Sequence, residues 1–261
     1  MLSRDQIKMS LSGLELEARR DKTAQENNLG AFISLYKKNL ASIPNLNKKI
    51  FWNDLLTKNE SLIIKSPIFV DKIKIVSEFL LRKKGKIIDI GFGYGYLEDL
   101  LRSKESLLTI FGIDVSTEAV NRSKRKFNGI TKAGLVTNIP FKDRMFEGAV
   151  ALDVLEHVSP SQLFRSLKEI SRILKSNGFL VVSVPLNEGL KEMIIKGVNP
   201  NGHVRAYTPN ILNTELKIAG FNCEGIRFLY AYHNLYEFKS FFARIISKNP
   251  NLLIGIYRKT G

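Results

Sequence analysis

The stretch "KIIDIGFGYGYLEDLL", residues 86–101, decides the fold, because it joins a short β-branched run to a helical pattern through closely spaced glycines. The glycines follow a GxGxG spacing, at Gly91, Gly93 and Gly95, and Asp89 stands two residues before the first of them. A glycine-rich turn after a strand lets a ligand approach the backbone and places it at the start of the next helix. The stretch therefore predicts a strand, a ligand-binding turn and a helix.

The ligand expected at this turn is a nucleoside without a pyrophosphate. The dinucleotide fingerprint GxGxxG would need a glycine where Tyr96 stands, and the GK[ST] ending of a phosphate-binding loop is absent. Asp114 ends the next expected strand, where an acid can accept hydrogen bonds from both hydroxyls of a ribose. The alternative interpretation is a tight strand–helix turn with a solvated aspartate.

After this turn the sequence alternates between strand and helix patterns, which predicts an α/β domain with a mostly parallel sheet covered on both faces. The strands are expected at residues 86–91, 107–116, 132–137, 146–155, 177–186, 221–230 and 252–259, and the helices at 96–103, 117–127, 159–174 and 210–220.

The domain is expected to span residues 81–261, behind a helical N-terminal cap at 1–80. The end of this cap has one apolar helical face, with Gly85 as the expected C-cap. The apolar face consists of Val70, Ile73, Val76, Phe79 and Leu80.

The composition of the chain indicates its cellular environment and the kinds of partner it could bind. Cys223 is the single cysteine and the chain has 3 histidines, so we expect no disulfide and no metal site. A charged N-terminus and the lack of a long apolar run predict a cytoplasmic protein. The net charge of +15 favours anionic partners, and nucleic acid is among them.

An insertion at 228–250, before the last strand, carries aromatic and aliphatic residues at helical spacing with basic flanks. This pattern is typical of a helix that rests on an anionic membrane, and it predicts peripheral membrane contact through 234–248. An ordinary helix packed on the core would show the same pattern. The apolar positions are Leu235, Phe238, Phe241, Phe242, Ile245 and Ile246.

Three quoted segments resemble the class I S-adenosylmethionine (SAM)-dependent methyltransferases, and the resemblance covers about residues 80–261. "IIDIGFGYG" is similar to the first motif of the family, "IDVS" to the second, and "IPFKDRMFEGAVALDVLEHV" to the segment around the fourth strand. The nearest branch acts on small molecules and includes quinone-biosynthesis enzymes. The resemblance implies SAM as cofactor and a Rossmann-like, seven-stranded, mostly parallel sheet with an antiparallel last strand.

The resemblance also implies positions for the cofactor. Asp89 and the three glycines would border the amino-acid end of SAM, Asp114 would hold the ribose, and Asn138 with Ile139 would flank the adenine. Leu135 stands where the family often has an acid. The expected cofactor-binding residues are Asp89, Gly91, Gly93, Gly95, Asp114, Val115, Asn138, Ile139 and Asp153.

The candidate catalytic residues are His157, in "LEHV", and His203, in "NGHVRAYT", because both follow the carboxyl ends of expected strands. His203 would contact the acceptor or act as general base, whereas His157 also fits a structural role. Arg205 and Tyr207, beside His203, are expected to bind the substrate, with Arg205 pairing with an acidic group.

The predicted function is transfer of a methyl group from SAM to a small-molecule acceptor. The favoured acceptor is a hydroxyl of a sugar, a lipid-linked compound or an isoprenoid. A tRNA- or protein-modifying methyltransferase and a non-catalytic methyltransferase-like subunit are the alternatives.

Overall fold

The computed structural model describes residues 48–63, 65–197, 199, 201–232, 239–240, 242–243 and 249–261. Most of the expected N-terminal cap, and most of the segment 234–248 expected to contact a membrane, lie outside these residues. No helix among the described residues is both long enough and apolar enough to cross a membrane.

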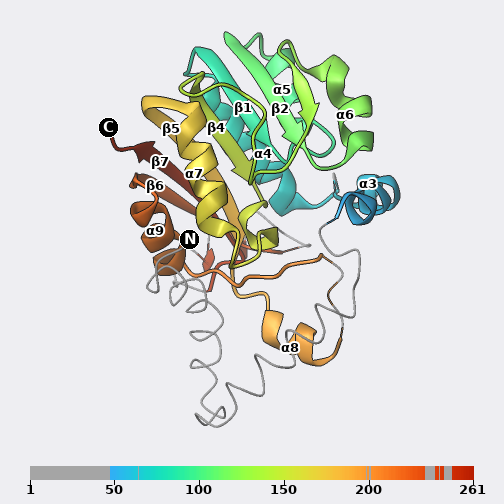
Figure 1. Cartoon of the computed structure of the whole chain (residues 1–261). Coiled ribbons are helices and arrows are strands. Elements are labelled where there is room, and N and C mark those ends of the chain that lie inside the picture. Colours follow the sequence, from blue (N-terminus) through green and yellow to red (C-terminus); the bar gives the residue numbers. More distant parts are fainter. Residues whose placement is uncertain are drawn as a thin grey trace.

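The centre of the fold is a seven-stranded sheet with the order β3-β2-β1-β4-β5-β7-β6 (Figure 1). Neighbouring strands from β3 to β5 are parallel, whereas β7 runs antiparallel to both β5 and β6. The fold class expected from the sequence is therefore confirmed. The strands are β1 Gly85–Ile90, β2 Leu108–Asp114, β3 Thr131–Ala133, β4 Phe146–Leu152, β5 Leu174–Pro185, β6 Phe221–Leu229 and β7 Leu252–Lys259.

Helices cover both faces of the sheet, as the alternating pattern predicted (Figure 1). The α-helices are α3 Lys49–Ile63, α4 Pro67–Leu80, α5 Tyr96–Ser103, α6 Thr117–Ser123, α7 Leu163–Ile173, α8 Leu190–Ile195 and α9 Pro209–Ile218, and two short 3₁₀ turns are η2 Lys124–Lys126 and η3 Leu155–His157. Helices α3 and α4 precede β1 and belong to the expected cap, whose boundary at residue 80 stays a prediction.

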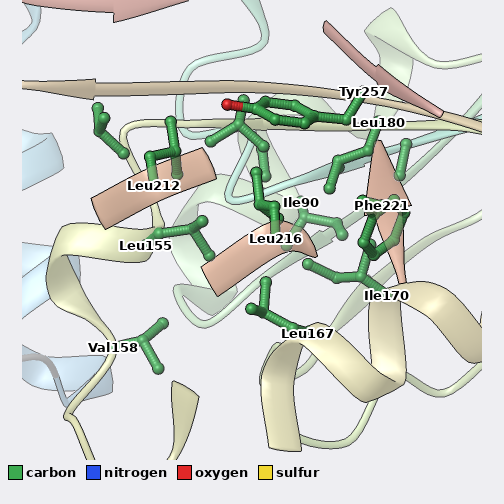
Figure 2. Packing of buried hydrophobic residues seen from close by; sticks show 14 of the residues in the cluster. Ile90, Leu155, Val158, Leu167, Ile170, Leu180, Leu212, Leu216, Phe221 and Tyr257 are labelled. Atoms are coloured by element: carbon green, nitrogen blue, oxygen red, sulfur yellow. The ribbon is translucent and has the colours of Figure 1, made fainter. Parts of the chain in front are cut away.

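The strands divide their apolar side chains between two cores, one on each face of the sheet. Ile88 and Ile90 of β1 pack with α7 and α9, whereas Ile87 packs on the opposite face with α4 and α5. This alternation follows from the two-residue period of a β-strand. Figure 2 shows the first core, where Leu167 of α7 and Leu216 of α9 converge. Two covered faces leave the ends of the strands as the place where a ligand can bind.

The connection between α4 and β1 differs from the sequence expectation in two respects. Leu81, in right-handed helical conformation, is the C-cap of α4, and Gly85 instead begins β1 with a φ of 98°. After α4, Leu81 and Arg82 form a turn, and Lys83 and Lys84 connect it to the strand. Val70 was expected on the apolar face, but its side chain is 53% exposed.

A glycine in β4 allows close packing of the sheet against an aromatic ring. A Cβ added at Gly148 would lie 2.1 Å from Phe179 Cζ on β5. We expect Gly148→Ala to lower the free energy of unfolding by about 1–3 kcal/mol, because the ring cannot move away in a packed core. Urea unfolding would measure the change. Gly225→Ala is the matched control, since a Cβ there would meet nothing within 4 Å; equal losses in both variants would contradict the packing argument.

Candidate active site

The loops at the carboxyl ends of the parallel strands surround a cavity of about 1200 Å³. Side chains from the loops after β1, β2, β4 and β5 form its floor, and α3 and α4 close it with Trp52, Leu56 and Phe69. Parallel strands bring these loops to one edge of the sheet, so residues far apart in sequence meet there. The cavity lies where the sequence predicted ligand binding.

The glycine loop is held in shape by the carboxylate at the end of β2. Gly91, Gly93 and Gly95 have φ angles of 73°, 55° and 70°, which side-chain-bearing residues rarely adopt. The N–H of Gly93 donates to Asp114 Oδ2 at 2.9 Å, and the N–H of Ser116 donates to Oδ1 at 2.8 Å. Burial raises the pKa of the Asp114 carboxyl, although these two hydrogen bonds oppose the shift. Asp114 therefore joins the glycine loop to the start of α6.

A second acid lies beneath the same loop, next to a buried glutamate. Asp89 is 4% exposed and Glu98, in the first turn of α5, is fully buried. Burial and the neighbouring Glu98 carboxyl raise the pKa of Asp89 well above its usual range, and burial raises the pKa of Glu98 to about 7. Because two neighbouring buried carboxylates repel each other, the pair favours a state in which one carboxyl group is protonated.

The opposite end of the cavity contains two histidines in contact. The rings of His157, on η3, and His203, in the loop before α9, have centroids 4.8 Å apart. His157 Nδ1 lies 3.2 Å from the carbonyl oxygen of Gly202, and His203 Nδ1 lies 2.7 Å from Glu188 Oε2. Burial, followed by the nearby His203, lowers the pKa of His157 to about 3, so its ring is neutral near pH 7. Trp52 of α3 packs edge-on against His157, with ring centroids 4.6 Å apart.

Between the two ends lies Asp153, directly after β4, with a φ of 54°. Its carboxylate forms an ion pair with the buried Lys72 of α4 and accepts a 2.5 Å hydrogen bond from Ser183 Oγ. Burial opposes ionisation, but Lys72 and Ser183 hold the pKa of Asp153 below its usual range. A non-glycine residue in this conformation is strained, and such strain is frequent at functional sites.

Most of the expected site residues meet at this cavity, but three of the expected cofactor-binding residues do not line it. Gly95 starts α5 as its N-cap. Asn138 and Ile139 were expected beside an adenine, but residues 134–137 line the wall instead. Ile139 is buried, and its N–H donates to Glu169 Oε2 at 2.9 Å. The expected residues that line the cavity are Asp89, Gly91, Gly93, Asp114, Val115, Asp153, His157 and His203.

The structure does not place Arg205 and Tyr207 at the cavity, where the sequence predicted substrate binding. Arg205 is 3% exposed and forms a buried ion pair with Glu215 of α9. Tyr207 is 4% exposed within the core against α7 and α9, and its hydroxyl donates to the Leu155 carbonyl oxygen at 3.5 Å. A guanidinium buried this deeply needs an acidic partner. Because Glu215 is that partner, the charge of Arg205 is not available to pair with a substrate.

Sequence reasoning missed three residues that line the cavity, Trp52, Lys72 and Glu156, and it also missed Glu188, the partner of His203. Glu156 adjoins His157, and Glu188 follows β5 at the ligand-binding edge. Their positions in the sequence therefore indicated that they could belong to the site. Nothing in the sequence indicated that Lys72 belongs to the site, because a lysine in an amphipathic helix is ordinarily solvated.

The comparison with known proteins identifies the family. A family model for a methyltransferase domain matches residues 68–225. An uncharacterised protein of Methanocaldococcus jannaschii (MJ0638) is 28% identical over 176 residues, which are 67% of this chain and 69% of that protein. Demethylmenaquinone methyltransferase of Thermotoga maritima is 31% identical over 110 residues, 42% of this chain and about half (47%) of that enzyme. A SAM-dependent methyltransferase structure from Thermotoga maritima shares the fold, with a TM-score of 0.60, 19% identity and coverage of 81% of this chain and 99% of that chain.

The chain therefore belongs to the methyltransferase-domain family. It is a SAM-dependent methyltransferase, as the sequence predicted.

The buried carboxyl pair generates a testable pH dependence. Because the pKa of Glu98 is about 7 in the folded protein and 4.5 ordinarily, the folded state binds more protons between these values. The associated stability is complete below about pH 4.5 and is lost as the pH rises through about 7. Glu98→Gln keeps the shape and a hydrogen-bond donor for Asp89. We therefore expect this variant to gain about 3 kcal/mol relative to the parent between pH 4.5 and 8.

Urea unfolding across this pH range would measure the gain. Glu118→Gln, at an exposed carboxylate paired with Arg122, is the control and should follow the parent protein. Parallel stability curves for the parent and Glu98→Gln would show that the pair shares no proton.

Proposed function

We propose that SAM binds along the glycine loop, with its amino-acid end near Asp89 and its ribose at Asp114. A Cβ at Gly93 would meet only Leu56 Cδ2, at 3.7 Å, so this backbone faces the cavity without obstruction. Each oxygen of Asp114 accepts one backbone N–H and keeps a lone pair for a ribose hydroxyl. Val115 lies next to this carboxylate, and the adenine would lie against residues 134–137. These features support a nucleoside cofactor.

The acceptor in this proposal is a small molecule with an apolar body and a hydroxyl group. The cavity beyond Asp153 is closed by Trp52, Phe69 and Ile73, which would shelter a ring or an isoprenoid chain. The relative from Thermotoga maritima is named for a quinone, demethylmenaquinone, which supports a quinone-like acceptor over a sugar.

The observation that carries the hydroxyl assignment is the pair of His203 and Glu188. A carboxylate can only accept, so His203 Nδ1 carries the hydrogen of their 2.7 Å bond, and in the neutral ring Nε2 is the atom with a lone pair. An imidazole oriented in this way can take the proton of a hydroxyl as its oxygen is methylated. SAM, when bound, supplies a methyl group that already carries its leaving group. The protein must then orient the acceptor, exclude water and accept one proton.

Substitution of Gly93 tests the cofactor site. Gly93→Val should abolish SAM binding, because a branched side chain would fill the face of the loop and strain a φ of 55°. Calorimetry with S-adenosylhomocysteine would measure affinity, and Gly225→Val, in open space on β6, would serve as control. Unchanged affinity of Gly93→Val would refute this placement of the cofactor.

Substitution of His203 tests the acceptor chemistry. Labelled SAM would first be incubated with separated lipid, RNA and protein fractions and with isoprenoid hydroquinones. We expect label in the lipid fraction and the hydroquinones, and label confined to RNA or protein would refute the acceptor class. His203→Ala should then lower turnover by about 100-fold, because the proton loses its acceptor, while S-adenosylhomocysteine affinity stays normal. Full turnover would remove His203 from the mechanism.

A further inference from the structure

Three potential ligand groups converge at the acceptor end of the cavity. Glu156, His157 and His203 each offer one atom, and these atoms all lie within 4.8 Å of one another. Glu156 and His157 share η3, and the N–H of Val204 donates to the Glu156 carbonyl oxygen at 2.9 Å, which holds the His203 loop against η3. Ligands about 2.1 Å from one ion are separated by about 3–4 Å, so a small closure would bring the three atoms around a cation.

The two imidazoles are already oriented as metal ligands. The Gly202 carbonyl and the Glu188 carboxylate can only accept, so both histidines carry their hydrogen on Nδ1. In the neutral form of each ring, Nε2 is therefore the nitrogen whose lone pair a cation would bind. Metal-bound histidines almost always donate their other N–H to a carbonyl or a carboxylate in this way, because the bond fixes the tautomer and the ring orientation.

Glu156 is a buried acid that forms no ion pair with the described residues. By contrast, Asp153 pairs with Lys72, and Glu215 pairs with Arg205. Glu156 is fully buried, and neither carboxylate oxygen has a hydrogen-bond partner among the described residues. A buried carboxylate without a partner is costly, and a bound cation would remove that cost.

We propose that Glu156, His157 and His203 bind a divalent transition-metal cation of the Zn²⁺ or Mn²⁺ type. Two imidazoles and one carboxylate suit such ions better than Mg²⁺ or Ca²⁺, which prefer sets of oxygen ligands. Three protein ligands beside a cavity leave coordination positions open, as in catalytic metal sites. This reverses the expectation of no metal: two of the chain's 3 histidines lie together, which their sequence positions did not show.

The cation would also change how the acceptor is activated, and this consequence rests on the proposed function. A hydroxyl bound to a divalent cation has a lowered pKa and loses its proton more readily. His203 Nε2 would then be a ligand, and the proton would pass to solvent. Cation binding itself does not depend on the identity of the acceptor.

Direct titration of the full chain tests the site without an acceptor. Protein stripped with a chelator would be titrated with Co²⁺, followed by its visible absorption, and Zn²⁺ would then compete. We expect one equivalent to bind and Zn²⁺ to displace it. Glu156→Gln and His203→Gln, which nearly preserve side-chain volume, should weaken binding by 100-fold or more. Glu188→Gln should weaken it by about 10–100-fold, because it alters only the orienting hydrogen bond.

Glu98→Gln is the matched control, because it changes a fully buried carboxylate on α5, away from the three proposed ligands, and should leave Co²⁺ affinity unchanged. Circular dichroism and S-adenosylhomocysteine binding would show that each variant is folded. Absence of saturable binding, or equal affinity in the parent protein and Glu156→Gln, would overturn the site. Cation binding without methylation of any hydroxyl compound would refute the proposed function alone.

Discussion

The rest of the site depends on the hydrogen bonds accepted by Asp114. Its two oxygens bind the backbone of the glycine loop and of the residue that starts α6, so one carboxylate fixes two loops at the edge of the sheet. The same line of contacts continues outward, because Ser116 Oγ accepts from Ala119 N–H and donates to Asn53 on α3 at 2.6 Å. The cofactor loop, a helix start and the helix that closes the cavity are therefore one connected unit.

The sequence predicted the sheet and the glycine loop well because both depend on local patterns. The residues of α5 and β7 match their expected ranges, and the strand ends carry the acids expected there. The acceptor end was predicted less well because it depends on how distant segments pack. Arg205 and His203 are close in sequence, yet one turns into the core toward Glu215 and the other lines the cavity. Only the packing of α9 against the sheet decides between these directions.

The buried carboxyl groups at the two ends of the cavity have different surroundings. At the cofactor end, burial raises the pKa values of Asp89 and Glu98, which disfavours a double negative charge. At the acceptor end, Asp153 is paired with Lys72, whereas Glu156 lies beside His157 and His203. The sequence indicated that acids and histidines follow these strands, but burial and partners, which decide their charge, come from the tertiary structure.

The attachment of α3 to the cofactor loop has a consequence for traffic through the cavity. Tyr94, between the loop glycines, donates its hydroxyl hydrogen to the Leu56 carbonyl oxygen of α3 at 2.5 Å, and Ser116 binds Asn53 on the same helix. Trp52 and Leu56 of that helix cover both ends of the cavity. A movement of α3 that opens the acceptor end of the cavity would also break the hydrogen bonds at the cofactor end. Entry of the acceptor and entry of the cofactor are therefore coupled through this helix.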